Sequence, residues 1–129
     1  MSRRSRVHWR HESGAVDVSI QTLFGMMLAL GAMLLVVEAS AYWHARNVFA
    51  EAAAEGARVA AAYDGSCQKG VAAARAMVST HASGWASGLE VRCQRGQMVS
   101  VTVTARTPGV LAGSLGFRAR ASEEVPREG

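Results

Sequence analysis

The sequence lacks charged side chains over residues 18–37, and Glu38 is the first charge to follow. A helix needs about 20 mainly apolar residues to cross a bilayer, and this interval is long enough. We therefore predict a cytoplasmic segment over residues 1–14, a transmembrane helix over 15–38 and an external domain over 39–129.

Motifs for catalysis and cofactor binding are also missing. The sequence has no nucleophile elbow, Gly-rich phosphate loop, HExxH or paired-carboxylate pattern. His81 is expected to be a solvated residue on a helix rather than a base. The other histidines (His8, His11 and His44) lie far apart and mostly on the opposite side of the membrane from the cysteines, which argues against zinc. We expect a protein that is not an enzyme and uses no cofactor or metal.

Basic residues cluster only near the start of the chain, at Arg3, Arg4, Arg6 and Arg10. The net charge of +4 is otherwise spread among acids, without the basic stripe and stacking aromatics of a nucleic-acid-binding surface. Lys and Arg next to a membrane helix stay in the cytoplasm. We therefore expect a single-pass protein of the cell membrane, with a cytoplasmic N-terminus and an extracytoplasmic C-terminus.

A secreted protein with a cleaved signal peptide is the alternative. Ala39 and Ala41 form a small-x-small cleavage pattern directly after the apolar run. Signal peptides have a shorter apolar region, of roughly 7–15 residues. The length of the run favours a retained anchor.

Proline is absent from residues 39–62, so nothing there forces the helix to end at the membrane surface. Tyr42 and Trp43 lie at the depth of the lipid headgroups, where such rings are favoured. Glu51, Glu55 and Arg58 occupy one side of this helix, and alanines recur on another at spacings of three and four: Ala50, Ala53, Ala54, Ala57, Ala60 and Ala61. We predict one helix over residues 15–62 that buries its alanine face against a sheet.

The remaining residues predict a small α+β domain. A second helix is expected over residues 68–82, after a loop that holds Cys67. Apolar and polar residues alternate over 89–94 and 99–106, which indicates an antiparallel hairpin with a turn at 94–97. We expect residues 107–109 to break the sheet, a short helical turn at 110–114, a third strand over 117–122 and a polar tail from 123. The fold is thus a long N-terminal helix, a short helix and a three-stranded antiparallel sheet.

The only two cysteines, Cys67 and Cys93, both fall in the predicted external domain. Two cysteines in an oxidising compartment suggest a disulfide. Cys93 is on the apolar side of its strand, where Cys67 could meet it. Two unpaired thiols are the alternative.

Two further patterns have both a functional and a structural interpretation. Gly25 and Ala29 form a small-xxx-small pair that would let a second helix approach in the membrane, while Asp17 and Glu38 either mark the ends of the apolar run or take part in helix docking. The strands carry arginines on their polar side, which form either a solvated face or a site for an anionic ligand: Arg92, Arg95, Arg106, Arg118 and Arg120.

Several short stretches follow a common pattern around the apolar run. Ser13-Gly14-Ala15-Val16 precedes it, Glu38 ends it, and Tyr42, Arg46-Asn47-Val48 and Ala52-Ala53-Ala54-Glu55-Gly56-Ala57-Arg58 follow. With these residues, the segment 12–62 resembles the TadE/TadG-like family of pseudopilin-like proteins from the tight-adherence (Tad, Flp) pilus system. Glu55-Gly56-Ala57-Arg58 is the most specific part, since it is similar to the family's AAREGAR-like sequence, with Ala54 in place of the usual arginine.

The resemblance implies a pilin-like architecture, an exported C-terminal domain and a role in pilus assembly or secretion. It also implies processing by a prepilin peptidase between Gly14 and Ala15. Prepilin-type segments usually carry glutamate at the fifth position after the cut, where this chain has Ser19. That carboxylate can pair with a neighbour's free amine, so its lack favours a minor pseudopilin or a membrane assembly component over a major subunit.

We therefore expect the chain to act by contacts with the membrane and with other pilus-assembly or pseudopilin subunits. Residues expected to pack helices are Gly25, Ala29, Glu38, Ala50, Ala53 and Ala57. The alternative is a membrane-anchored module that binds an anionic envelope ligand on the arginine-rich strand face.

Overall fold

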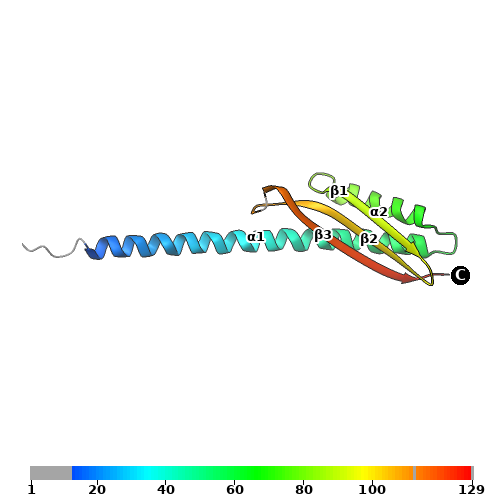
Figure 1. Ribbon diagram of the computed structural model, residues 1–129, viewed down its shortest axis with the longest axis horizontal. Helices are drawn as coiled ribbons and strands as arrows, with labels where there is room; N and C mark the ends of the chain where they lie inside the picture. Colours follow the sequence, from blue (N-terminus) through cyan, green and yellow to red (C-terminus); the bar gives the residue numbers. More distant parts are fainter. Residues whose placement is uncertain (1–12, 112, 129) are drawn as a thin grey trace, which may run out of the picture. The chain divides into compact units, whose positions relative to one another are not determined.

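The computed structural model describes residues 13–111 and 113–128, in five elements (Figure 1). The expected cytoplasmic arginines lie outside these residues. Helix α1 (Ser13–Ala61) is followed by helix α2 (Cys67–Ala82) and by strands β1 (Ser87–Arg95), β2 (Met98–Gly109) and β3 (Gly113–Pro126). The expected long helix, short helix and three-stranded antiparallel sheet are confirmed.

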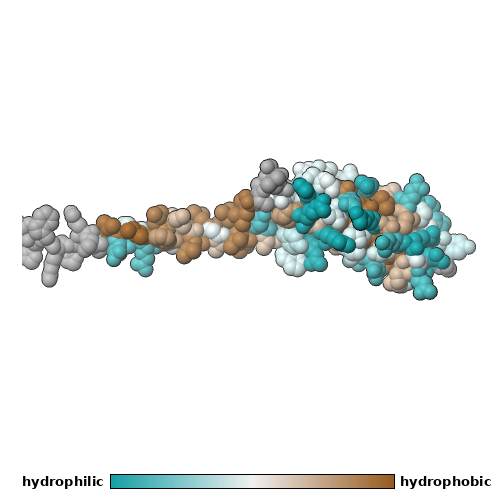
Figure 2. Space-filling view, viewed as in Figure 1, coloured by the Kyte–Doolittle hydropathy of each residue, from teal (hydrophilic) through white to brown (hydrophobic). Residues whose placement is uncertain are grey.

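The chain divides into two compact units, with the boundary after Leu35. The first unit contains only helix among the described residues, and its side chains from Val16 onward are exposed. Figure 2 shows hydrophobic side chains along this part of α1. Within the described chain, α1 is the one helix long and apolar enough to cross a membrane. By length and composition, it is a candidate membrane span.

The second unit begins at Val36, three residues before the start expected from the sequence. It contains the rest of α1, helix α2 and a sheet of strand order β1-β2-β3, with both strand pairs antiparallel. Alternation in β2 gives one buried face, formed by Val99, Val101, Val103, Ala105 and Thr107. Both helices pack against this face.

The core is built mainly from alanine and valine. Helix α1 buries the side chains of Phe49, Ala53 and Ala57, and β3 adds Ala119 and Ala121. Because most of these side chains are alanine or valine, the helices can lie close to the sheet. Phe49 is the one large aromatic side chain that is fully buried among the described residues, and the partly buried Trp85 packs beside it, with its ring 5.9 Å from that of Phe49.

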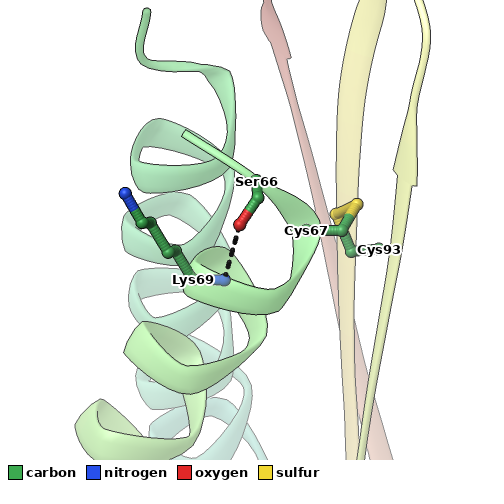
Figure 3. Close-up of a disulfide and its surroundings, with 4 residues drawn as sticks. All are labelled: Ser66, Cys67, Lys69 and Cys93. Atoms are coloured by element: carbon green, nitrogen blue, oxygen red, sulfur yellow. Dashed lines mark hydrogen bonds between the residues drawn. A yellow bond between two sulfur atoms is a disulfide. The ribbon is translucent and has the colours of Figure 1, made fainter. Parts of the chain in front are cut away.

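Helix α2 starts one residue earlier than expected, so Cys67 is helical and not in a loop. The reason is a cap at Ser66, whose hydroxyl oxygen accepts a hydrogen bond from the backbone N–H of Lys69 at 3.2 Å (Figure 3). Such a cap satisfies a backbone donor that would otherwise have no partner at the helix start. Gly70, Ala74, Val78 and Ala82 then form the buried face of α2.

The prediction that the sheet breaks at residues 107–109 was wrong, because β2 continues to Gly109. Proline cannot donate a hydrogen bond to a strand ladder and is tolerated at edges and bulges. Pro108 meets both conditions. Strand β1 pairs with β2 only as far as Arg106, and the register with β3 shifts between Thr107 and Gly109.

The two expectations for the C-terminal region were also wrong. A hairpin joins β2 to β3 in place of the helical turn at 110–114, and β3 includes residues 123–126 of the expected polar tail. The residues after β3 also have backbone partners. The N–H of Glu128 donates to the carbonyl of Ala61 at 2.9 Å, and the N–H of Arg127 donates to that of Gln97 at 3.1 Å.

Candidate functional site

Glu38 connects α1 to the tip of the β2–β3 hairpin. Its Oε2 atom accepts a hydrogen bond from the backbone N–H of Val110 at 2.6 Å and another from that of Leu111 at 3.3 Å. The contact is close, since a Cβ atom added to Gly109 would collide with the same carboxylate. One side chain of the helix therefore binds two successive donors of the hairpin tip, defined here as residues 109–111.

Aromatic side chains extend this contact by one helical turn. The ring of Tyr42 lies 5.4 Å from the ring of Phe117 in β3. The guanidinium carbon of Arg46 lies 5.9 Å from the centre of the Trp43 ring. The face of such a ring attracts a cation. Trp43 itself remains exposed, as does Tyr42 to a smaller extent.

The small residues expected to pack helices fall into two groups. Gly25 and Ala29 belong to the first unit, where both are exposed and no atom lies within 4 Å of the position that a Gly25 Cβ would occupy. Ala53 and Ala57 are fully buried in the core of the second unit, and Ala50 packs against it. The first group is thus open to a partner, whereas the second is covered by the protein's own sheet and α2.

The stretch Glu55-Gly56-Ala57-Arg58 lies where α1 approaches α2. Glu55 and Arg58 form an ion pair of 2.6 Å on the outside. Gly56 faces inward, and a Cβ atom there would lie 2.8 Å from the carbonyl oxygen of Gly70. Real Cβ contacts are longer than this, so the glycine allows the two helix backbones to approach closely.

Cys67 and Cys93 lie at disulfide distance, with sulfur atoms 2.05 Å apart and Cα atoms 5.5 Å apart (Figure 3). The pair joins the first turn of α2 to β1. It leaves no free cysteine in the chain. Closing this link fixes the N-terminal end of α2 against the sheet.

The outer face of the sheet carries a hollow of about 300 Å³, lined by Glu90, Arg92, Thr102, Thr104, Arg118 and Arg120. Dark teal, strongly hydrophilic side chains lie over the strands in Figure 2. Arg92 is paired with Glu90 at 2.5 Å. Arg106 lies directly opposite Arg118 in the strand register, and among the described residues neither of these arginines forms an ion pair. Arg95 is exposed but does not line the hollow.

The other expected site residues have few contacts. Gly14 and Ala15 lie in the first turn of α1, and Asp17 is exposed on the same helix. His81 is exposed in the last turn of α2. Within residues 13–111 and 113–128, no group of three or more His, Cys, Asp or Glu side chains is placed to hold a metal ion.

Sequence reasoning missed the hairpin tip and the role of Trp85. Val110 and Leu111 are two adjacent apolar residues after a Pro-Gly pair, which is a typical turn signal. The ring of Trp85 lies 5.9 Å from that of His44 and 5.9 Å from that of Phe49, so it packs the α2–β1 loop against α1.

Comparison with protein-family models, curated proteins and solved structures found no match.

Proposed function

We propose that this chain is a single-pass, TadE-like membrane protein of pilus biogenesis or secretion, either a minor pseudopilin or a membrane assembly component. Its apolar helix packs against helices of other subunits in the cell membrane. Its second unit lies on the extracytoplasmic side and contacts other components of the assembly.

One observation carries this proposal. The apolar side chains of residues 16–37 are exposed, whereas the same helix from Ala45 onward supplies the core of the second unit. A soluble protein rarely leaves so large an apolar surface uncovered. Lipid and neighbouring helices are the surroundings that suit it. The open pair Gly25 and Ala29 would allow a neighbouring backbone to approach closely.

The resemblance of residues 12–62 to TadE-like proteins supplies the biological setting. The Cys67–Cys93 pair also suits an oxidising extracytoplasmic compartment. Both points agree with the orientation expected from the basic N-terminal residues.

The intact mass of the protein recovered from native membranes tests the proposal. A protein that starts at Ala15 has been cut by a prepilin peptidase and is a pseudopilin. One that starts at or near Met1 keeps its helix as a permanent anchor and is an assembly component. A start after Ala41 would show a secreted domain and overturn the proposal.

Site-specific photo-crosslinking tests the partner class. A photoreactive residue in place of Ala29 is expected to capture pilus-assembly subunits identified by mass spectrometry. The same residue in place of exposed Arg75 on α2 serves as a control for non-specific capture. If Ala29 captures no protein of a pilus or secretion system, the chain does not assemble through this helix.

A second candidate function is the binding of an anionic envelope ligand, and the hollow in the outer sheet face favours it. Arg118 and Arg120 offer guanidinium groups that match phosphate or carboxylate oxygens, and Thr104 adds a hydroxyl donor. The test is binding of polyphosphate to the full chain in neutral nanodiscs at low and high salt. The double variant R118Q/R120Q should lose salt-sensitive binding, whereas R75Q should keep it. Equal binding by both variants would exclude this face.

A further inference from the structure

The hairpin tip presents two apolar side chains to the surroundings. Val110 is 57% exposed and the next residue, Leu111, is 58% exposed. Both follow Gly109 in the chain. On a soluble domain, neither residue would be favoured at the end of a hairpin. Their backbone is held in place, because both N–H groups donate to the carboxylate of Glu38.

Glu38 sets the depth of this tip relative to Val36 and Val37, the residues of the apolar run that belong to the second unit. It directly follows Val37, the last residue of the uncharged interval. When residues 18–37 span the hydrocarbon, chain continuity places Glu38 at the boundary between acyl chains and headgroups. Each residue of a helix adds only about 1.5 Å along its axis. A backbone in hydrogen-bond contact with Glu38 must therefore lie at the same boundary, whatever the tilt of the helix.

The Glu38 contact also removes the main obstacle to membrane entry of the tip. Backbone N–H groups without acceptors are costly in a weakly polar medium. The two donors at the tip already have an acceptor inside the protein. The side chains that remain exposed there are apolar, and the aromatic rings of Tyr42 and Trp43 follow Glu38 within about one helical turn, as expected at an interface.

We propose that the hairpin tip inserts Val110 and Leu111 into the outer leaflet at the level of the headgroup–acyl boundary, as a second membrane contact beside the helix. The occupant of this apolar end is lipid, since Glu38 holds the tip at the end of the apolar run, where Val36 and Val37 are also exposed. The inference rests on the proposed membrane anchoring. Two contacts fix the orientation of the second unit on the membrane, which a single helix does not.

The test uses the full chain, with its disulfide intact, in dioleoylphosphatidylcholine vesicles. An environment-sensitive NBD fluorophore is attached to one introduced cysteine at a time: L111C in the tip, Q97C in the β1–β2 turn and M27C in the apolar run. Gln97 is the matched control, because it lies beyond the opposite end of β2. Lipids with a spin-label quencher near the headgroup report contact.

We expect quenching at Leu111 to exceed that at Gln97 several-fold, with a blue-shifted emission. Adding E38A should release the tip and lower the quenching at Leu111, with Gln97 unchanged. If Met27 is quenched by lipids labelled deep in the acyl chain but Leu111 behaves like Gln97, the tip does not enter the membrane and this inference fails alone. If Met27 is not quenched either, the proposed membrane anchor fails.

Discussion

Gly56 and Gly70 face each other where α1 approaches α2, and neither position has room for a side chain. A Cβ atom on Gly70 would lie 2.6 Å from the carbonyl oxygen of Gly56 and 2.6 Å from the Cβ atom of Ala60. At both positions the atoms within 3.0 Å of the added Cβ are backbone oxygens and alanine Cβ atoms, which cannot move aside as a flexible side chain could. The glycine of the stretch Glu55-Gly56-Ala57-Arg58 thus has a physical explanation within this single chain.

Replacing Gly56 with alanine should therefore destabilise the second unit. Overpacking of a tight core costs about 1–3 kcal/mol, since the helices must move apart. Thermal unfolding in detergent, followed by circular dichroism, measures the effect. Gly84→Ala is the matched control, because no atom lies within 4 Å of its added Cβ. Equal melting points for the two variants would contradict the close approach.

Reduction of the Cys67–Cys93 pair should lower the melting temperature. The cysteines are 26 residues apart. Closing a loop of that length lowers the conformational entropy of the unfolded chain, which stabilises the folded state by about 3–4 kcal/mol. Cys67→Ser should have the same effect without reductant, and reductant should then cause no further change. An unaltered melting temperature for Cys67→Ser under oxidising conditions would rule out a stabilising disulfide.

Glu38→Ala should expose the backbone of the hairpin tip to solvent exchange. The variant removes the acceptor for the N–H groups of Val110 and Leu111, and hydrogen bonds to a charged group contribute about 1.5–3 kcal/mol. Hydrogen–deuterium exchange at these two amides should accelerate. Glu51→Ala, an exposed acid further along α1, should leave their exchange unchanged. Slow exchange in Glu38→Ala would mean that another group protects the tip.

Arg118→Glu should stabilise the sheet slightly at low salt. The residue lies directly opposite Arg106 in β2, and like charges at such positions repel while opposite charges attract, by about 0.2–1 kcal/mol. The gain should shrink as salt is added. Arg75→Glu on α2 provides the control for a general change of net charge. A lower melting temperature for Arg118→Glu would show that the arginine has a structural partner.

Local patterns were sufficient to predict most of the elements. The alternation of valine with serine and threonine over residues 99–104 specifies a strand with one buried face. Because Cys93 pairs with Val101 in the hairpin, it lies on the same face of the sheet, toward the helices. The alanine spacing on α1 likewise predicts the buried side. These features follow from the two- and 3.6-residue periods of the backbone, which a sequence displays directly.

Contacts between distant residues were less accessible. Glu38 and Val110 are separated by 72 residues, and the sequence pointed to Glu38 only as the end of an apolar run or as a residue that packs against another helix. Its partner could not be foreseen while residues 107–109 were expected to end the sheet. Pro108 was misjudged because its tolerance depends on where β1 stops pairing, and that is a property of the assembled sheet.

The place of β3 in the order of synthesis determines when the second unit can complete its core. This 14-residue strand follows the other four described elements in sequence, yet it supplies Ala119 and Ala121 to the core and one side of the hairpin that meets Glu38. Until it is available, the alanine face of α1 has no complete cover. The core of the unit is therefore complete only after β3 has been synthesised, and a nascent chain truncated before β3 would expose that core to chaperones and proteases.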